Sequence, residues 1–381
     1  MEDLEVEFQS WLRDGGEVHP ALDLLGGAGE RGVYARSSIA RGEVLLRVPS
    51  SKCVFAADAA AGGASQLRLA SALADLLQEP RNSAFGPYLE SLPLRPPALE
   101  VWTAAERRLL RGTSLRSHAA QKPEPTTPWL HAARLVQTRA LELDVGHIQG
   151  WCLAPGIDAL NDYRGRCEQP STRLRVDEVG EGFELVMYAE RKIAAGDEVA
   201  HCYDDAATAA QLLERYGFFA PGGLPAAADF EVDDVIHGCA DHLEPRRRAC
   251  RSATAPHSRV SVTLDGPLPE PLLSVFILML MPASDFLELQ ADDAANLDAV
   301  EILLDDADFA AIVLGAVDEA ALSKIQAFAD EDDFLAAGLD SARSDAAFSL
   351  RGAERETLQG LRRAAKQLLG KAQLRAAKSR R

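Results

Sequence analysis

Residues 30–49 read ERGVYARSSIARGEVLLRVP, and this stretch decides the fold. Short runs rich in β-forming residues lie on either side of an Arg41-Gly42 turn and stop at Pro49. Such runs, bounded by glycine and proline, are typical of short strands. The stretch therefore predicts two small strands near the start of a β-rich domain.

Residues 27–32, GAGERG, match the glycine pattern of dinucleotide-binding proteins, but their surroundings argue against that interpretation. In those proteins the last glycine opens a helix whose N-terminus binds a pyrophosphate. Here β-forming residues and the Arg41-Gly42 turn follow Gly32. We therefore predict no nucleotide-binding helix at this point.

The remaining chain alternates between helical and strand patterns. Alanine- and leucine-rich stretches with helical spacing run from about residue 56 to about residue 143. Strand patterns return at 151–155, 183–188 and 198–203. A β-rich region is thus divided by a helical insertion.

A Gly- and Pro-rich segment at 221–225 separates this region from a stretch of amphipathic helices. We place the domain boundary there. The sequence predicts an α+β protein, with a β-rich domain at 1–220 and an all-α domain at 221–381.

Composition narrows the class of protein. The 381 residues carry a formal net charge of −18, and 47% are hydrophobic while 26% are charged. These values are typical of a soluble globular protein, and the length predicts two domains. A nucleic-acid binder needs a basic surface. We therefore expect a protein partner, no nucleic acid, and a monomer.

The six cysteines form no C-x-x-C pair, so we expect neither a disulfide framework nor a metal site. The longest apolar run, 272–281, is shorter than the roughly 20 residues that cross a bilayer, which predicts no membrane partner. The acidic N-terminus is unlike a signal or transit peptide. We expect a soluble intracellular protein of the cytoplasm or nucleus, and a chloroplast location only if a transit peptide has been removed.

Several blocks of the sequence resemble, in this order, SET-domain methyltransferases of the Rubisco large-subunit lysine methyltransferase type. They are ERGVYA at 30–35, PYLESLP at 87–93, LRGTSL at 110–115, VQTRA at 136–140, DALND at 158–162, and Tyr203 followed by YGF at 216–218. The ordered set covers roughly residues 26–220. The helical remainder resembles, less specifically, the substrate-binding domain that follows SET in this subfamily.

This resemblance implies a protein-lysine N-methyltransferase with S-adenosylmethionine as the cofactor and a lysine of another protein as the target. It implies Tyr203 as the catalytic residue, and Tyr203 with Tyr216 as substrate-binding residues. The cofactor-binding residues that it implies are Glu30, Arg31, Gly32, Arg139, Asp158, Asn161, Asp162 and Phe218. One branch of the family methylates histidine, so a histidine target stays open, as does a non-catalytic SET protein that binds a partner.

The residue types fit this chemistry. A sulfonium donor is already activated, so a site needs no metal and must mainly align donor and acceptor in a dry channel. A lysine amine, with a pKa of about 10.4, must lose its proton before attack. The Arg139 guanidinium suits a carboxylate, and Asn161 offers both donors and acceptors. Taken alone, the two tyrosines are more often packing residues, and DALND is more often an ordinary turn.

Two positions depart from the family pattern. The family usually has histidine where Asp162 stands, and asparagine where Ala209 stands. Both positions lie in blocks that face the cofactor. If the usual histidine acts through its backbone, aspartate can replace it, whereas a role for the imidazole would lower cofactor affinity.

Overall fold

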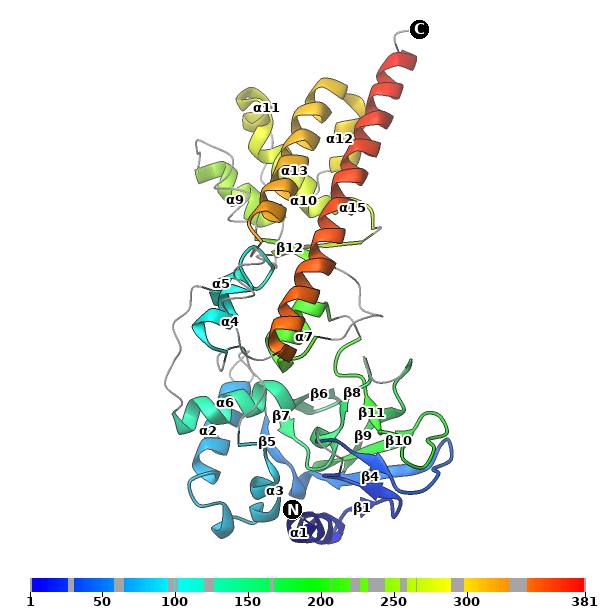
Figure 1. Ribbon diagram of the computed structural model, residues 1–381. Helices are drawn as coiled ribbons and strands as arrows, with labels where there is room; N and C mark the ends of the chain where they lie inside the picture. Colours follow the sequence, from blue (N-terminus) through cyan, green and yellow to red (C-terminus); the bar gives the residue numbers. More distant parts are fainter. Residues whose placement is uncertain are drawn as a thin grey trace. The chain divides into compact units, whose positions relative to one another are not determined.

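The chain folds into two compact units, which Figure 1 shows as a computed structural model. The N-terminal unit comprises 1–98, 124–207 and 215–223, and the C-terminal unit comprises 99–123, 208–214 and 224–381. The structure describes residues 2–26, 31–57, 65–94, 99, 102–119, 127–164, 168–205, 207–219, 227–231, 244–253, 259–264, 266–288, 298–328 and 341–379. The second unit thus includes 99–123 and 208–214, which we had expected in the first domain.

The described residues of the N-terminal unit form four small sheets. An antiparallel sheet has the order β1 (Glu17–Val18), β4 (Val44–Pro49), β10 (Gly182–Ala189) and β9 (Thr172–Val179). A second has the order β5 (Val54–Ala57), β7 (Ile148–Leu153) and β6 (Leu141–Val145). Two pairs complete the set: β2 (Leu22–Asp23) with β3 (Tyr34–Ala35), and β8 (Asn161–Asp162) in parallel with β11 (Ala200–His201).

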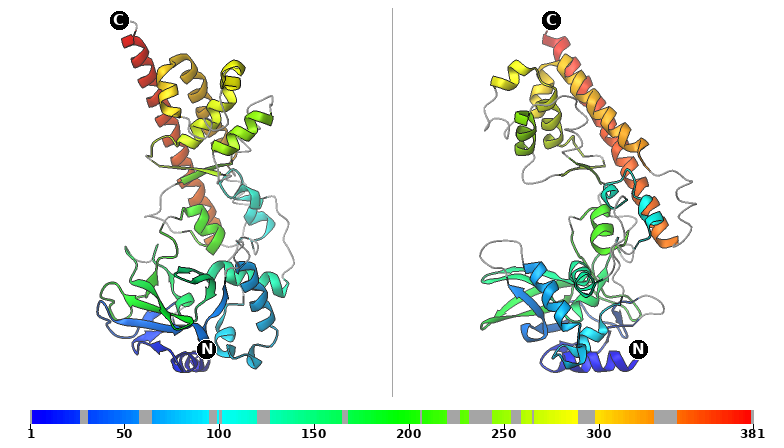
Figure 2. Two further views of the ribbon diagram at one scale, coloured as in Figure 1. Left: turned by 180° about the vertical axis from the view of Figure 1, so that it is seen from behind. Right: turned by 90° about the vertical axis from the view of Figure 1, so that its left-hand side faces the viewer.

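Helices cover these sheets. They are α1 (Glu2–Arg13), α2 (Ser65–Leu76), α3 (Gly86–Ser91) and α6 (Pro128–Arg139), with short 3-10 turns η1 (Ser50–Lys52), η2 (Pro80–Asn82) and η4 (Ile157–Ala159). α6 begins where the Thr127 hydroxyl accepts a hydrogen bond from Leu130 N at 3.1 Å, with Pro128 at its first position. α2 lies beside α6 (Figure 2) and packs against β5 and β7.

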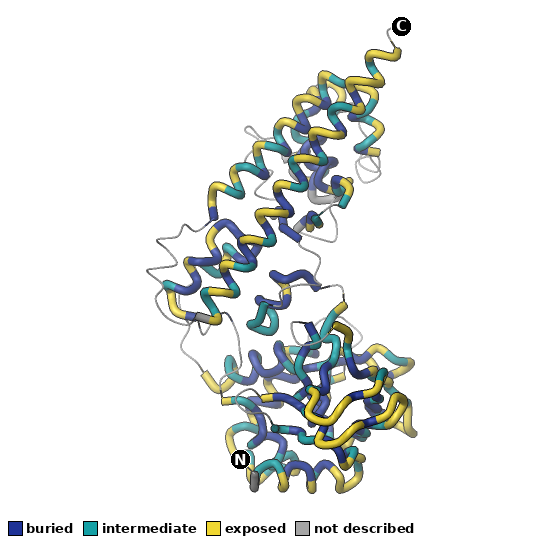
Figure 3. Tube along the Cα trace, turned by 45° about the vertical axis from the view of Figure 1, so that its right-hand side comes forward, coloured by how far each residue is buried: buried dark blue, intermediate teal, exposed yellow. Residues whose placement is uncertain are grey.

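The C-terminal unit is mainly helical. It contains α4 (Ala104–Arg108), α5 (Arg116–Ala119), α9 (Glu244–Ala253), α10 (Glu270–Leu280), α11 (Ala283–Glu288), α12 (Ala299–Asp305), α13 (Ala307–Gln326), α15 (Ser341–Ser379), and the strands β12 (Ala227–Glu231) and β13 (Arg259–Thr263). α10 is buried from Leu272 to Leu278 because it is apolar on every face. α13 runs alongside α15, whose buried positions alternate with exposed ones (Figure 3).

The fold class predicted from the sequence is confirmed, with one addition: the antiparallel pair β12–β13 accompanies the C-terminal helices. The predicted strand patterns correspond to β7, β10 and β11. Among the described residues that follow Gly32, the next element is β3 and not a helix, in line with the rejected dinucleotide pattern. Over the described parts of the chain, no helix has the length and apolarity needed to span a membrane.

Candidate active site

Three aromatic side chains from separate parts of the chain form one cluster in the N-terminal unit. Tyr203 follows β11, and its ring centroid lies 4.6 Å from that of Tyr216 and 6.2 Å from that of Phe218. Tyr216 ends α7 (Ala209–Tyr216). Gly217 then turns the chain at φ +74°, a left-handed conformation that glycine adopts without strain. This turn brings both Tyr216 and Phe218 against Tyr203.

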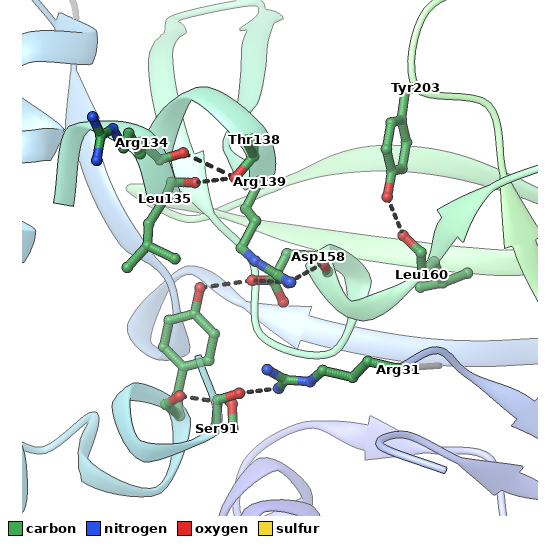
Figure 4. Close-up of polar contacts among 10 residues, drawn as sticks. Arg31, Ser91, Arg134, Leu135, Thr138, Arg139, Asp158, Leu160 and Tyr203 are labelled. Atoms are coloured by element: carbon green, nitrogen blue, oxygen red, sulfur yellow. Dashed lines mark hydrogen bonds and ion pairs between the residues drawn. The ribbon is translucent and has the colours of Figure 1, made fainter. Parts of the chain in front are cut away.

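The Tyr203 hydroxyl donates a hydrogen bond to the main-chain carbonyl oxygen of Leu160 at 2.8 Å (Figure 4). Burial raises the pKa of Tyr203 above its usual range, and the charge of Arg139 only partly opposes this effect. The side chain is therefore a neutral phenol at physiological pH. It can donate a hydrogen bond, but it cannot serve as a preformed phenolate base.

Arg139 and Asp158 meet on the side of the site formed by α6 and η4 (Figure 4). Arg139 Nη1 donates to the Asp158 carbonyl oxygen at 2.6 Å and lies 3.6 Å from Asp158 Oδ2. The Tyr88 hydroxyl donates to the same carboxylate at 2.9 Å. Burial raises the pKa of Asp158, against the opposing effects of Arg139 and Tyr88. Gly156, at φ +82°, makes the turn from β7 into η4 that presents Asp158.

A third group of residues links two segments: the residues just before β3, and β8. The Asn161 Nδ2 donates to the Arg31 carbonyl oxygen and to Glu198 Oε1, each at 2.7 Å. Gly32 fits here because a Cβ would lie 2.7 Å from Glu198 Oε1 and 2.8 Å from Asn161 Nδ2. The Arg31 guanidinium donates to the Ser91 carbonyl oxygen. Glu30, which we also predicted to bind the cofactor, lies outside the described residues.

Asp162 lies in β8, and its carboxylate is turned inward and paired. Arg164 Nε donates to Oδ1 at 2.8 Å and Arg164 Nη2 to Oδ2 at 2.9 Å, and the two side chains are 1% and 3% exposed. Burial lowers the pKa of Arg164, but hydrogen bonding and the charge of Asp162 raise it more. The negative charge of Asp162 is thus neutralised within the protein.

A cavity of about 270 Å³ connects two of these groups. Its lining residues are Thr138, Arg139, Ala140, Leu141, Glu142, Ile157, Asp158, His201, Tyr203, Asp204, Arg215 and Tyr216. His201 accompanies Tyr203 in this wall, and burial lowers its pKa, which favours the neutral imidazole. Arg139 Nε is buried and has no hydrogen-bond partner among the residues that the structure describes.

The structure thus brings most of the predicted residues into three adjoining groups. Arg139, Asp158, Tyr203 and Tyr216 line the cavity, whereas Arg31, Gly32, Asn161, Asp162 and Phe218 do not. Ala209 is buried at the start of α7. Within the described ranges, no three His, Cys, Asp or Glu side chains are grouped as metal ligands would be.

Sequence reasoning missed four contributors: Tyr88, the Leu160 carbonyl, Arg164 and Glu198. Tyr88 stands in the block PYLESLP, which carried part of the resemblance. A main-chain carbonyl has no sequence signal at all. Glu198 meets Asn161, and Arg164 meets the Asp204 carbonyl, only when β8 and β11 pair.

A model of the SET domain family matches residues 30–204. The whole chain has the fold of Rubisco LSMT. A solved structure of the SET domain of LSMT bound to lysine and AdoHcy has a TM-score of 0.75 at 18% identity, over 98% of this chain and 93% of that chain. Rubisco LSMT bound to AdoMet has a TM-score of 0.72 at 18% identity, over 97% and 93%. No curated protein matches the sequence.

These matches confirm the resemblance inferred from the sequence.

Proposed function

We propose that the chain is an S-adenosylmethionine-dependent methyltransferase that acts on a lysine side chain of another protein. The observation that carries the proposal is the Tyr203 hydroxyl, which meets the Leu160 carbonyl beside a cavity that also contains Arg139. The SET domain and the LSMT complexes with AdoMet, AdoHcy and lysine support it.

The residues around Arg139 fit the carboxylate end of the cofactor. A buried guanidinium nitrogen without a partner favours a ligand that accepts hydrogen bonds, and a carboxylate matches the guanidinium fork. The cavity of about 270 Å³ beside Arg139 would hold this end of the cofactor.

The segment Arg31-Gly32 with Asn161 would hold another part of the cofactor. A side chain at position 32 would collide with Asn161 and Glu198, so glycine is required there. Because glycine has no side chain, a ligand can approach the backbone closely. Amide and carbonyl groups of this segment are of the kind that recognise polar ligand atoms. When bound, S-adenosylmethionine supplies a sulfonium-activated methyl group.

The aromatic cluster would form the channel for the target lysine. A lysine side chain buried between the rings of Tyr203 and Tyr216 would be shielded from water, which disfavours its ammonium form and helps it lose its proton to solvent. Attack of the neutral amine on the sulfonium-activated methyl group would form the C–N bond as the C–S bond breaks, and the sulfur would leave as a thioether. The Tyr203 hydroxyl and the Leu160 carbonyl would align the amine.

The decisive experiment incubates the purified chain with methyl-labelled S-adenosylmethionine and protein extracts, and locates the label by mass spectrometry. We expect labelled lysine, and Tyr203→Phe should abolish most labelling. Label on histidine would assign the alternative target. If no protein is labelled and calorimetry detects no cofactor binding, the proposal is wrong.

A further inference from the structure

The chain beyond β11 is held by a side-chain pair and not by strand pairing. The parallel pairing of β8 and β11 ends with Tyr163 N donating to the His201 carbonyl oxygen at 2.8 Å. Two residues later, Tyr203 N donates to Asp162 Oδ2 at 2.9 Å. The Asp204 carbonyl oxygen accepts from Arg164 Nη2 at 2.7 Å. Side chains of one segment thus bind the backbone of the other.

The geometry of the pair suits this role. Arg164 N and Nε both donate to Asp162 Oδ1, at 2.9 and 2.8 Å, which fixes the carboxylate plane. The guanidinium fork reaches the carboxylate and the Asp204 carbonyl at once, which a lysine ammonium on a flexible stem cannot reproduce. Both side chains are nearly inaccessible to solvent, so water does not compete for these bonds.

We propose that the Asp162–Arg164 pair positions Tyr203 for methyl transfer, an inference that rests on the proposed function. Leu160 lies two residues before Asp162, so the pair ties the Tyr203 backbone to the segment whose carbonyl its hydroxyl contacts. The pair thereby sets the distance between the phenol and that carbonyl. Both side chains are nearly inaccessible to solvent and bind each other and the backbone of Tyr203 and Asp204, so both act through Tyr203 as positioning residues.

The same pair explains why aspartate stands at a position where the related family usually has histidine. An unpaired carboxylate at this depth would be costly, and Arg164 supplies the matching charge two residues away. Asp162 therefore contributes to the site through its partner and its hold on Tyr203.

The test uses the whole chain with Asp162→Asn and Arg164→Gln combined, which removes both charges together and leaves no buried unpaired ion. We expect the single-turnover methyl-transfer rate to fall about 10- to 100-fold, since misplacing a reacting group by about 1 Å can cost 10²-fold. The dissociation constant for S-adenosylmethionine should change less than about threefold. Arg164→Lys, which keeps the charge and loses the fork, should give an intermediate rate.

A double-mutant cycle separates positioning from general destabilisation. In a Tyr203→Phe background the pair substitution should reduce the residual rate by less than about threefold, because its effect passes through the missing hydroxyl. An equal loss in both backgrounds would overturn the proposal, as would an unchanged rate in the Tyr203-containing variant.

Amide hydrogen exchange provides a readout that does not depend on activity. The Tyr203 amide should exchange at least tenfold faster in the double variant, while the Ala200 amide, bound to Ser171 Oγ at 2.8 Å, stays protected. Unchanged exchange of the Tyr203 amide would refute the proposal that the pair positions Tyr203. A third result is possible, in which the wild-type chain has no methyl-transfer activity and the Tyr203 amide still exchanges faster in the double variant. This result would contradict the proposed function, but it would establish that the Asp162–Arg164 pair binds the Tyr203 backbone.

Discussion

At the scale of single residues, the Tyr203 hydroxyl is the group on which the chemistry depends. Removing it by Tyr203→Phe should lower the rate of methyl transfer about 10²- to 10³-fold, the usual loss for one aligned hydrogen-bond donor. Cofactor affinity should stay nearly constant because the ring remains. Single-turnover kinetics and calorimetry measure the two effects.

Tyr188→Phe is the matched control, because Tyr188 lies on β10 and outside the cavity. Its ring centroid lies 5.0 Å from Arg175 Cζ. It should leave the rate unchanged. If both phenylalanine variants retained full activity, the prediction that methyl transfer depends on the Tyr203 hydroxyl would be wrong.

Arg139 allows a separate prediction about cofactor affinity. Arg139→Lys keeps the positive charge but loses the planar fork. Hydrogen bonds to charged groups contribute about 1.5–3 kcal/mol, so the dissociation constant for S-adenosylmethionine should rise roughly 10- to 100-fold. Isothermal titration calorimetry measures this change, and the exposed Arg175→Lys on β9 serves as its control. Equal affinity in the two variants would contradict the assignment.

At the scale of elements, the turn from β7 into η4 positions Asp158 and so the partner of Arg139. Gly156→Ala introduces a left-handed non-glycine residue, which costs about 1–2 kcal/mol. Its Cβ would also lie 3.2 Å from Leu12 Cδ2. We expect a lower melting temperature together with weaker cofactor binding.

Gly196→Ala is the control that measures the cost of backbone strain without a steric clash. At Gly196 φ is +86°, and a Cβ would meet no atom within 4 Å. This control should lower the melting temperature and leave cofactor binding intact. Weakened binding in both variants would show that general destabilisation, and not the turn at Gly156, is responsible.

Element prediction succeeded where local pattern and burial agree. The apolar segment at 272–281 became α10, because an element that is apolar on every face is buried in any arrangement. β9 was missed because its residues 172–179 alternate charged and apolar side chains, and its identity depends on pairing with β10. The amphipathic stretch at 301–314 belongs to two helices, α12 and α13, which are divided at Asp306, whose carboxylate accepts from Asp308 N and Phe309 N.

At the scale of the whole molecule, one buried acid links stability to pH. Glu354 on α15 is fully buried, and its two carboxylate oxygens accept from Ser114 N at 2.9 and 3.0 Å. Burial raises its pKa from 4.5 to about 7, against the opposing effects of Lys324 and Ser114. Because the folded state binds the proton of Glu354 more tightly than the unfolded state does, protonated Glu354 contributes to the free energy of unfolding. This contribution is fully present below pH 4.5 and is lost as the pH rises through 7.

Calorimetry of the full chain between pH 5 and pH 8 tests this linkage. Relative to Glu354→Gln, the wild type should lose roughly 2–3 kcal/mol of stability over that range. The exposed Glu356→Gln on the same helix should keep the wild-type pH dependence. Parallel curves for the wild type and Glu354→Gln would contradict the prediction.

The net charge of −18 should influence the encounter with a substrate. For a basic peptide that carries the target lysine, kcat/KM should fall as ionic strength rises, because salt screens charges over about 10 Å at 0.1 M. The value of kcat should change little. A peptide with the same lysine in a neutral sequence is the control, and equal salt dependence of both peptides would refute electrostatic steering.

Local sequence patterns were sufficient for the SET fold, for the helical C-terminal region and for four of the residues that line the cavity. Arg139, Asp158, Tyr203 and Tyr216 stand in short ordered blocks, and apolar periodicity specifies elements locally. Tertiary structure alone decided how Asp162 is used. Its hydrogen bond to Tyr203 joins residues 41 positions apart and exists only because β8 pairs in parallel with β11.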